Sequence, residues 1–456
     1  MKEEKGIEKK EAEVIKEEKK ETKKKKEKYT KSINFPGLVD VASDPDGKVV
    51  YLIKENGKIS ISREEITDEE VLIPPGKKNM PFELADAGKV LYHFYSKTFE
   101  EDFYSQVEDY FRKACYLEDD QFLLVSLYVF LTYLRDHKDV RHMPIYLFFA
   151  VPERGKTRIG RSITNIAYRG VHTVNLNPAG TFRYMNDHRA SIFFDVMDLW
   201  TDVVKHNVRD IFLTGFHKGA TISRVLYPER GPFNDTVIYE IYGPMIIATN
   251  EAVNHILGTR CIEISTPNMP GEYTNYLAND RVVLELKALL TAWKAKLIDE
   301  QLPLVKKVSG IDGRLWDISK PLLSVCKWVC PGRYDELVNA LLKQAKSRVE
   351  DKGESLEGRI VNIIHKLSKS RAGNVIMTSE IEIKLNDGLP EAMHTSAKTL
   401  GRRLKALGIK TDRLTGRSRV TIEQGVLEKL YEQYDCNQIE EPATGETQVT
   451  QKTIIS

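Results

Sequence analysis

The feature that most constrains this chain is an apolar run at residues 145–149, followed by a turn that closes with Gly155, Lys156 and Thr157. A phosphate-binding loop needs a buried strand to fix its position, inward backbone N–H groups, a lysine on the β- and γ-phosphates and a hydroxyl on Mg²⁺. Lys156 and Thr157 can fill the last two roles. The run therefore predicts a loop that binds ATP, with Mg²⁺ held in part by Thr157. The residues of this loop are Ala150, Val151, Pro152, Glu153, Arg154, Gly155, Lys156, Thr157 and Arg158.

The loop departs from the usual pattern at its first position, where G-x-x-x-x-G-K-[ST] asks for glycine and the chain has Ala150. Alanine has a Cβ and adopts left-handed conformations less readily than glycine, although it is the smallest substitute. A chance Gly-Lys-Thr is therefore the alternative for this segment taken alone. The rest of the chain has to decide between them.

Length and composition indicate a globular chain with several domains. The 456 residues suggest about three domains, and a hydrophobic content of 41% is enough to build buried cores. The longest apolar stretch, residues 122–134, is shorter than the roughly 20 residues of a membrane-spanning helix, and the Lys/Glu-rich N-terminus has no signal-peptide pattern. We therefore expect a cytoplasmic or nuclear-like protein with no membrane partner.

Five cysteines are scattered through apolar or helical contexts: Cys115, Cys261, Cys326, Cys330 and Cys436. Only Cys326 and Cys330 lie close enough in sequence to suggest a pair, and no second Cys/His pair nearby would complete a zinc site. Reduced thiols in the core are the expected state.

The composition changes along the chain and predicts several segments. Residues 1–31 are almost entirely Lys and Glu and are expected to be a disordered tail, with a nucleic-acid or localisation role for its basic block as the lesser alternative. Residues 32–79 show alternating strands around an Asn56-Gly57 hairpin signal, which predicts a small β-rich module. Residues 80–140 have helical periodicity and are expected to pack on the nucleotide-binding core, ending in a buried helix at 121–135. Residues 435–456 are expected to be a second disordered tail.

The segment after the loop continues the pattern of an α/β domain. Residues 159–168 are expected to be a helix whose N-terminus faces the phosphates, and residues 172–176 the next strand. Residues 190–195 form an apolar run that ends in Asp195, at the end of a strand where α/β sheets place ligands and where a Mg²⁺-directing acid is required. The alternative is a core strand whose Asp195 only caps the next helix.

Further strand patterns follow. Residues 208–219 are expected to be a helix, and the runs at 221–227 and 236–242 flank a turn-rich stretch, which predicts a hairpin. An apolar strand at 244–250 ends in Thr249 and Asn250, and residues 256–264 follow with Arg260 among them.

Over residues 140–350, this order of phosphate loop, acid-ending strand, hairpin, Thr-Asn strand and arginine resembles the AAA+ ATPases. The likeness is greatest to the branch with a hairpin before the sensor strand, which includes superfamily III and minichromosome-maintenance helicases, and to helicase-like ATPases beside primases in phages and plasmids. Residues 182–185 and 215–219 resemble the last group. The fold class that this implies is α/β: an AAA+ P-loop NTPase core at 141–271, a helical lid at 272–350, the small N-terminal β-rich module, and a C-terminal winged helix-turn-helix at 355–434.

The resemblance also implies roles for single residues. Lys156 and Thr157 match the Walker A pair, Asp195 the Walker B acid and second Mg²⁺ ligand, and Asn250 the sensor that orients the attacking water. Arg260 matches an arginine finger, which would reach into a neighbouring subunit's site. The resemblance thus implies a homo-oligomer, such as a hexamer, with a primase or other replication proteins as further partners.

The match fails at Val196, where the family carries its catalytic glutamate. Asp198 is the nearest acid downstream. If the chain turns helical just past the strand, an i to i+3 offset puts Asp195 and Asp198 on the same side, and Asp198 could act as the base. The alternative is that Asp198 only caps the segment that enters Leu199.

Apolar positions at helical spacing in residues 272–350 predict the helical lid, with Arg314 as either a second sensor or a surface arginine. In residues 355–434, three amphipathic helices and a basic strand pair resemble a winged helix-turn-helix that offers its third helix to the major groove.

The C-terminal segment also carries a basic cluster. Between Thr395 and Arg419, eight basic residues and one acid give a net charge of +7, which is an electrostatic footprint for DNA. A solvated face in a domain-packing module is the alternative. The residues expected to bind DNA are Lys398, Arg402, Arg403, Lys405, Arg413, Arg417 and Arg419 here, and Lys218 and Arg230 at the hairpin turn, where they would grip single-stranded DNA.

Together these features predict a DNA-dependent AAA+ ATPase that acts as a replicative helicase or translocase of a mobile genetic element, such as a phage or plasmid. The alternative is an ATP-switched DNA-binding initiator or regulator with slow or no hydrolysis. Ala150 and Val196 favour the alternative, and the hairpin favours the helicase.

Overall fold

The computed structural model describes residues 28–434, except 97–98, 100–101, 151–152, 251–252, 254, 268–270, 371–374, 389, 391–393, 415–416 and 422–423. The chain divides into two compact units, Met1–Leu341 and Leu342–Ser456. Residues 1–27 of the tail expected at 1–31, and all of the tail expected at 435–456, lie outside the described residues.

A five-stranded parallel sheet forms the centre of the first unit. Its strands are β8 (Ile145–Phe149), β9 (Gly170–Thr173), β10 (Ser191–Asp195), β13 (Met245–Thr249) and β14 (Cys261–Ile264), in the order β14-β8-β13-β10-β9. All of β13 and the first four residues of β8 and β10 are buried, which is why these segments are continuous apolar runs. The α/β class is confirmed. The strand expected at 172–176 begins two residues earlier than predicted.

The strand order sets which side chains can meet. Strand β13 lies between β8 and β10, and its register pairs Thr249 with Phe149 and Ala248 with Asp195. The carboxyl ends of the loop strand and the acid strand therefore flank the end of β13 at one edge of the sheet. This is the edge where parallel α/β sheets bind ligands.

Two helices pack closely on this sheet. Helix α5 (Lys156–Ile166) lies against β10, and Gly160 allows the approach, because a Cβ there would be 2.3 Å from the Phe193 ring. Helix α4 (Asp119–Tyr133) is almost wholly buried, and its Tyr128 ring stacks on Tyr146 with centroids 3.9 Å apart. Tyr128 Oη also donates a hydrogen bond of 2.9 Å to the Met245 carbonyl. The buried helix expected before the loop strand is thus confirmed.

The helix expected at residues 208–219 is present only as α8 (Arg209–Thr214), whose C-cap residue is Gly215. The expectation is wrong for residues 215–219, which are not helical. Asn207, with φ of 53°, separates α8 from the preceding α7 (Leu199–Lys205), because a left-handed residue cannot continue a helix. Helix α6 (Pro178–Asn186) and the short α9 (His255–Gly258) complete this part of the unit.

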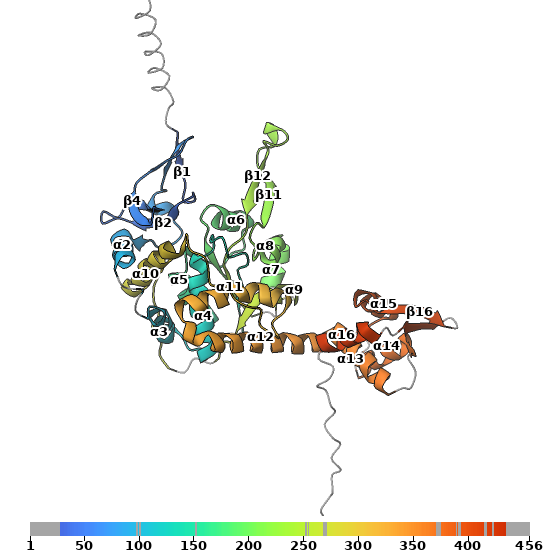
Figure 1. Ribbon diagram of the computed structural model, residues 1–456. Coiled ribbons are helices and arrows are strands. Elements are labelled where there is room, and N and C mark those ends of the chain that lie inside the picture. The colour runs from blue at the N-terminus through green and yellow to red at the C-terminus, as the bar shows by residue number, and fades with distance from the viewer. Residues whose placement is uncertain are drawn as a thin grey trace, which may run out of the picture. The chain divides into compact units, whose positions relative to one another are not determined.

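The predicted hairpin is present. Strands β11 (Thr221–Val225) and β12 (Thr236–Glu240) pair antiparallel and project from the first unit (Figure 1). Among the described strands, they pair only with each other. The turn between them includes the short helix η3 (Pro228–Arg230).

Two small sheets make up the N-terminal part. The larger contains β2 (Leu38–Ser43), β3 (Val49–Glu55), β4 (Lys58–Ser62) and β7 (Ala85–Asp86), and the smaller contains β1 (Tyr29–Lys31), β5 (Glu65–Ile66) and β6 (Val71–Ile73). Asn56 and Gly57 turn β3 into β4 with φ of 49° and 75°, as the Asn-Gly signal predicts. The disordered tail was expected to extend to residue 31. That is wrong for residues 29–31, which form β1 and pair in parallel with β6.

Residues 272–350 contain three α-helices, as expected, with a non-helical segment at 299–312. They contain α10 (Arg281–Leu297), α11 (Gly313–Val329), the short η4 (Pro331–Arg333) and the start of α12 (Tyr334–Glu354). Ala288, Ala292 and Ala295 on α10 pack into the core of the N-terminal sheet and α2 (Ala87–Tyr95). Residues four and three apart share a helix face, so this alanine face lets the sheet approach closely. A lid role for these helices stays a prediction.

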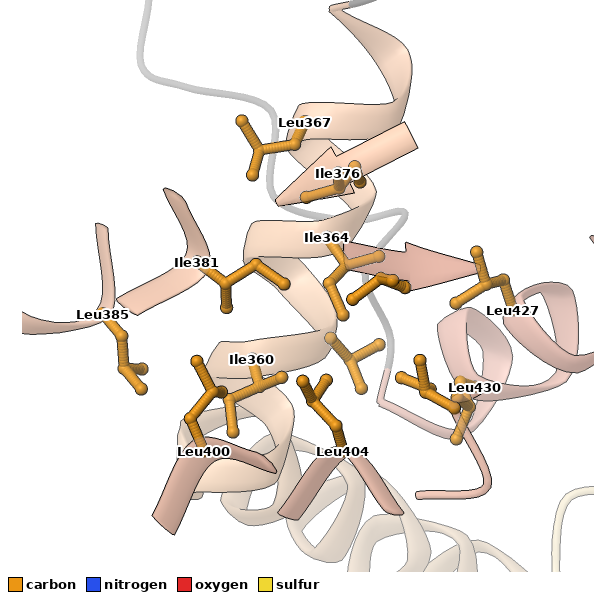
Figure 2. Close-up of a cluster of buried hydrophobic side chains, with 13 residues drawn as sticks. Ile360, Ile364, Leu367, Ile376, Ile381, Leu385, Leu400, Leu404, Leu427 and Leu430 are labelled. Atoms are coloured by element: carbon orange, nitrogen blue, oxygen red, sulfur yellow. The ribbon is translucent and has the colours of Figure 1, made fainter. Parts of the chain in front are cut away.

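The second unit has its own hydrophobic core. Its elements are α13 (Leu356–Lys369), β15 (Val375–Met377), α14 (Thr378–Asn386), α15 (Ala397–Ala406), β16 (Lys410–Leu414), β17 (Arg417–Thr421) and α16 (Gln424–Gln433), with sheet order β15-β17-β16. Ile364 of α13, Ile381 of α14 and Leu404 of α15 point into one cluster, which Leu427 and Leu430 of α16 close (Figure 2). The three expected helices are confirmed, and α16 is an additional one.

No helix in the described parts of the chain is long and apolar enough to cross a membrane.

Candidate functional site

The loop after β8 has the geometry of a cradle at a helix N-terminus. Gly155, the N-cap of α5, has φ of 78°, and Glu153 has φ of 65°. Lys156 opens the helix, and its Nζ donates to the Ala150 carbonyl at 2.5 Å, which closes the loop on itself. Helix N-termini bind anions through N–H groups that lack partners inside the helix. Val151 and Pro152 of the predicted loop lie outside the described residues.

Lys156 is positioned in a partly desolvated place. The residue is 8% exposed, and burial lowers the pKa of Lys156, while the Asp195 carboxylate acts in the opposite direction. A cation held this way interacts more strongly with an added negative charge than one in open solvent. The loop therefore favours an anionic ligand.

Thr157 and Asp195 meet at the carboxyl edge of the sheet. Thr157 Oγ1 donates a hydrogen bond of 3.1 Å to Asp195 Oδ1. A hydroxyl and a carboxylate oxygen are ligands that Mg²⁺ accepts, and Mg²⁺ commonly takes its remaining ligands from water and substrate phosphates. No group of three or more His, Cys, Asp or Glu side chains among the described residues would hold a metal alone. The pair thus suits Mg²⁺ that arrives with a nucleotide.

His172 is a neighbour of this pair that the sequence did not single out. Its Nε2 lies 3.5 Å from Asp195 Oδ2, and its ring stacks on Phe193 with centroids 4.9 Å apart. The His172 imidazole, and secondarily the hydrogen bond from Thr157, hold the pKa of Asp195 below its usual range, although partial burial raises it. The register that pairs His172 with Phe193 produces this contact. The sequence did offer one signal for this contact, namely a histidine in the strand that precedes the acid strand.

The segment after Asp195 is tied to the end of β13. The Val196 N–H donates to the Ala248 carbonyl at 3.1 Å, and the Asn250 N–H donates to the Met197 carbonyl at 3.2 Å. Asn250 is exposed and directly follows β13, and its sensor role stays a prediction. Val196 is 6% exposed and offers no carboxylate.

The helical offset predicted for Asp198 is wrong. Residues 196–198 are not helical, and α7 begins at Leu199 with Asp198 as its N-cap residue. The i to i+3 relation between Asp195 and Asp198 therefore does not hold. The Asp198 side chain is exposed and makes no capping hydrogen bond, so neither a base nor a cap role follows from its position alone.

The Arg260 side chain is buried within its own chain. The residue is 7% exposed, and its guanidinium donates to the carbonyls of Leu213 and Ile256, with a 2.7 Å bond to the first. Burial, and then nearby Arg314, lower the pKa of Arg260. This burial contradicts the expected finger geometry. Arg314 at the start of α11 is the exposed arginine here, and its Nη1 donates to Thr259 Oγ1 at 3.1 Å.

The two cations expected at the hairpin turn occupy different places. Lys218 lies before β11 and donates to the carbonyls of Asp136 and His137 at 3.1 and 3.0 Å. Burial lowers the pKa of Lys218 there. It is therefore a residue of the hairpin base, and the prediction that it lies at the turn is wrong. Arg230 is at the turn, exposed, with its guanidinium 3.9 Å from the centroid of the Tyr227 ring.

The turn also carries an aromatic residue that the prediction missed. Phe233 is 99% exposed and has φ of 72°. A bulky residue in the left-handed region is strained, and strain of this kind is often kept at functional sites. A phenylalanine between Pro232 and Asn234 gave no sequence signal, because apolar residues in turns occur without a role.

The basic residues of the second unit are not equivalent. Lys398, Arg402 and Lys405 are exposed and spaced i, i+4 and i+7 on α15, opposite its buried Leu400 and Leu404.

Two of the other basic residues are already paired with acids. Arg403 contacts Glu357 at 2.7 Å, and Arg419 makes two bonds to Asp412, of 2.5 and 2.9 Å. Arg413 is exposed, and the side chain of Arg417 lies outside the described residues. The α15 face is thus the main cationic surface.

No family model matches the sequence, and no curated protein matches it. Similar solved structures include the apo form of the NrS-1 C-terminal region, at 12% identity and a TM-score of 0.33, covering 85% of this chain and 96% of that one. The SCCmec type IV Cch helicase is similar at 12% identity and a TM-score of 0.36, covering 88% and 80%. Cdc6p from Pyrobaculum aerophilum is similar at 11% identity and a TM-score of 0.19, covering 69% and 94%. At identities and TM-scores this low, these likenesses assign no family and no activity to the chain.

Proposed function

We propose that the first unit binds ATP with Mg²⁺ at the carboxyl edge of its parallel sheet. The contact between Thr157 and Asp195 carries the proposal, because it brings a hydroxyl and a carboxylate together beside a helix N-terminus. Lys156 would exchange its bond to Ala150 for the β- and γ-phosphates. Thr157 and Asp195 would hold Mg²⁺, which would supply positive charge to offset that of the phosphates.

We further propose that the chain is a DNA-dependent ATPase of the AAA+ kind, acting as a helicase or translocase of a mobile element. The projecting hairpin supports this, since Phe233, Tyr227 and Arg230 combine ring faces with a cation at one turn. Single-stranded DNA is bound by such combinations, because every base has a face on which an aromatic ring can stack.

The second unit is proposed to be a winged helix-turn-helix that binds duplex DNA. Its order of helix, strand, two helices and a two-stranded wing supports this assignment. The exposed cationic face of α15 would meet phosphates at the major groove, while its leucine face anchors the helix to the core.

A homo-oligomer would bring a cation from one subunit to the phosphates of the next. Arg314 suits this role better than Arg260, because Arg314 is exposed and Arg260 is held by carbonyls of its own subunit. Such an arginine stabilises charge that develops in the transition state.

A second function is favoured by Val196. Hydrolysis needs a carboxylate near the attacking water, and the buried Val196 side chain can neither accept a proton nor orient water. On that account the protein binds ATP to assemble on DNA and hydrolyses it slowly, as an initiator or regulator would.

ATP turnover with and without single-stranded DNA separates these functions. If Asp198 acts as base through one intervening water, Asp198→Asn should lower turnover by about 10² to 10⁴ without loss of ATP affinity. Asp202→Asn, in the first turn of the same helix, is the matched control and should change turnover little. DNA-stimulated turnover in the wild type would support the helicase.

The variant Val196→Glu tests the second function, that of an ATP-switched DNA-binding protein. A sharp rise in turnover in this variant, together with slow wild-type turnover that DNA does not stimulate, would favour the ATP-switched protein. Absence of ATP binding by the wild type would contradict both functions.

A further inference from the structure

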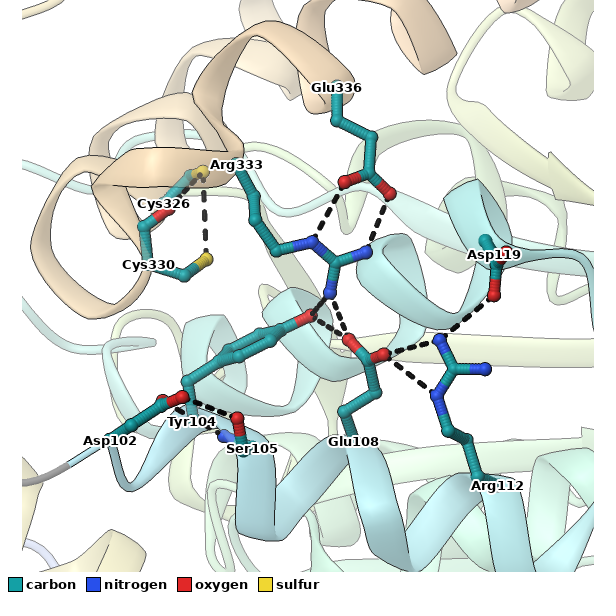
Figure 3. Close-up of polar contacts among 10 residues, drawn as sticks. All are labelled: Asp102, Tyr104, Ser105, Glu108, Arg112, Asp119, Cys326, Cys330, Arg333 and Glu336. Carbon is teal, nitrogen blue, oxygen red and sulfur yellow. Dashed lines mark hydrogen bonds and ion pairs between the residues drawn. The ribbon is translucent and has the colours of Figure 1, made fainter.

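Two cysteines approach each other at the end of α11, away from the nucleotide loop. Cys326 lies in the last turn of α11 and Cys330 is its C-cap residue, and their Sγ atoms are 3.7 Å apart (Figure 3). A disulfide bond is about 2.05 Å long. The backbone already closes this turn, because the Cys330 N–H donates to the Cys326 carbonyl at 2.9 Å. The turn therefore holds the two sulfurs close together.

The two thiols differ in access. Cys326 is fully buried, whereas Cys330 is partly exposed. Cys330 also lines a surface pocket of about 470 Å³, together with Tyr104, Glu108 and Arg333. A small reagent can thus reach Cys330 from solvent, with Cys326 directly behind it.

The contact between the two thiols favours a thiolate at the inner position. The hydrogen bond from the Cys330 thiol lowers the pKa of Cys326, and Arg333 acts in the same direction, although burial and Glu336 oppose both. The same contact, together with burial, raises the pKa of Cys330. Arg333 is fixed in place: it makes bonds of 2.8 and 2.6 Å to Glu336, donates to Tyr104 Oη at 3.0 Å, and contacts Glu108 (Figure 3).

The other described cysteines lack these features. Cys115 and Cys261 are buried, and each thiol donates at 3.3 Å to a carbonyl four residues earlier. Burial raises the pKa of Cys115 to about 12, so a thiolate is disfavoured there. Of the four described thiols, Cys330 is the one that is not buried.

We propose that Cys326 and Cys330 form a redox-active dithiol, which a low-molecular-weight disulfide converts into an intramolecular disulfide at the turn between α11 and α12. Cys330 passes its proton to the Cys326 thiolate across their 3.7 Å contact, and the Cys330 thiolate attacks one sulfur of the reagent, whose S–S bond breaks. One reagent thiolate leaves and is protonated. Cys326 then gives its proton to solvent, and its thiolate attacks Sγ of Cys330 and expels the second reagent thiolate. Two electrons pass from the pair to the reagent, which takes up two protons and becomes two thiols.

A disulfide between Cys326 and Cys330 would restrain the turn that directly precedes Arg333. Arg333 is three residues after Cys330, and it connects α3 (Tyr104–Ala114) with α12 through Glu108 and Glu336. A disulfide in a reducing compartment is usually transient and sensing, not structural. The site is thus a point at which the redox state acts on the packing between these helices.

The test uses the full chain, incubated with reduced and oxidised glutathione at defined ratios, quenched with acid, alkylated and digested with trypsin. Trypsin cuts after Lys327, between the two cysteines, so the disulfide joins peptides 315–327 and 328–333. The joined peptides should accumulate in the folded wild type at a ratio at least about tenfold less oxidising than in urea-unfolded protein. Cys115 and Cys261 should remain alkylated.

Single variants test the order of steps. Cys326→Ser should accumulate a mixed disulfide with glutathione on Cys330, because no second thiol can displace the glutathione. Cys330→Ser should leave the buried Cys326 reduced. The proposal is wrong if the wild-type peptides stay unlinked at every ratio, if a mixed disulfide on Cys330 persists in the wild type, or if folded and unfolded chains close the bond at the same ratio.

Discussion

The Thr157 hydroxyl donates a hydrogen bond of 3.1 Å to the Asp195 carboxylate, which joins the first turn of α5 to the last residue of β10. The two residues are 38 positions apart in sequence. Their contact results from the strand order, which places the ends of β8 and β10 at one edge, and from Gly160, which lets α5 lie against Phe193. The nucleotide site proposed above depends on this relationship.

Arg260→Ala should destabilise the first unit. The change removes the side-chain donor from the Leu213 carbonyl, and a buried acceptor left without a partner costs about 1–3 kcal/mol. The Ile256 carbonyl keeps its hydrogen bond from the Thr259 hydroxyl. Arg314→Ala should change stability by less than about 0.5 kcal/mol, because its side chain is exposed. Urea unfolding of both variants checks this.

The two arginines should also differ in turnover. If Arg314 acts on a neighbour's site, mixing Arg314→Ala with Lys156→Ala protein should restore some ATP turnover through hybrid interfaces. If Arg260→Ala is as stable as the wild type, and if mixing it with Lys156→Ala protein restores turnover, Arg260 and not Arg314 is the arginine finger.

Phe233→Gly should weaken binding of single-stranded DNA without loss of stability. Glycine accepts φ of 72° without strain, whereas the loss of a stacked ring costs roughly 1–3 kcal/mol of DNA affinity. Phe233→Trp should keep the affinity, and Ile66→Gly, an exposed apolar site in the N-terminal part, should not affect it. Fluorescence anisotropy with a labelled oligonucleotide measures these effects. If Phe233→Gly binds single-stranded DNA as tightly as the wild type does, the hairpin turn is not part of the DNA-binding site.

Arg402→Ala should weaken duplex DNA binding more than Arg403→Ala. Arg402 is exposed on the cationic face of α15, whereas Arg403 is engaged with Glu357. Each lost phosphate contact should reduce the slope of log affinity against log salt by about 0.9. Lys366→Ala on α13 is a charge-matched control. An equal loss in all three variants at every salt concentration would indicate that α15 makes no specific phosphate contacts.

Lys287 should make stability depend on pH. Burial lowers the pKa of Lys287 from 10.5 to about 8 in the folded chain. The unfolded chain therefore takes up this proton at higher pH, so stability is greatest above 10.5, falls as pH drops toward 8, and is constant below 8. Lys287→Met should raise stability at pH 7 by on the order of 3 kcal/mol, and by less at pH 9.5.

Lys296→Met is the matched control for Lys287, because Lys296 is exposed on the same helix. Urea unfolding at pH 7 and 9.5 gives the comparison. An equal gain for Lys287→Met at both pH values would show that packing, not the buried charge, is responsible.

The sequence allowed prediction of the features that depend on local pattern. A hydroxyl after Gly-Lys and an acid after an apolar run identified Thr157 and Asp195, and Asn56-Gly57 identified a hairpin. The sequence pattern did not reveal which groups hold the long side chains of Arg260 and Lys218. The Leu213 carbonyl, 47 positions away, holds Arg260, and the Asp136 carbonyl, 82 positions away, holds Lys218. Such carbonyls have no sequence signature.

Contacts that depend on register or on tertiary approach were also missed. His172 meets Asp195 because β9 and β10 pair in one register, and a shift by one residue would turn the imidazole to the other face. Asp198 failed as a prediction because the chain becomes helical only at Leu199. The exposure of Phe233 follows from the conformation of a turn, which its neighbours in sequence did not specify.

The most direct test of the account is the affinity of the purified protein for ATP, measured by calorimetry with Mg²⁺ and with EDTA. We predict that the wild type binds ATP more tightly with Mg²⁺, that Lys156→Ala abolishes binding, and that Thr157→Val but not Thr157→Ser removes the effect of Mg²⁺. Lys205→Ala, an exposed lysine at the end of α7, should bind as the wild type does. Undiminished ATP affinity in Lys156→Ala would contradict the assignment of this loop as the nucleotide site.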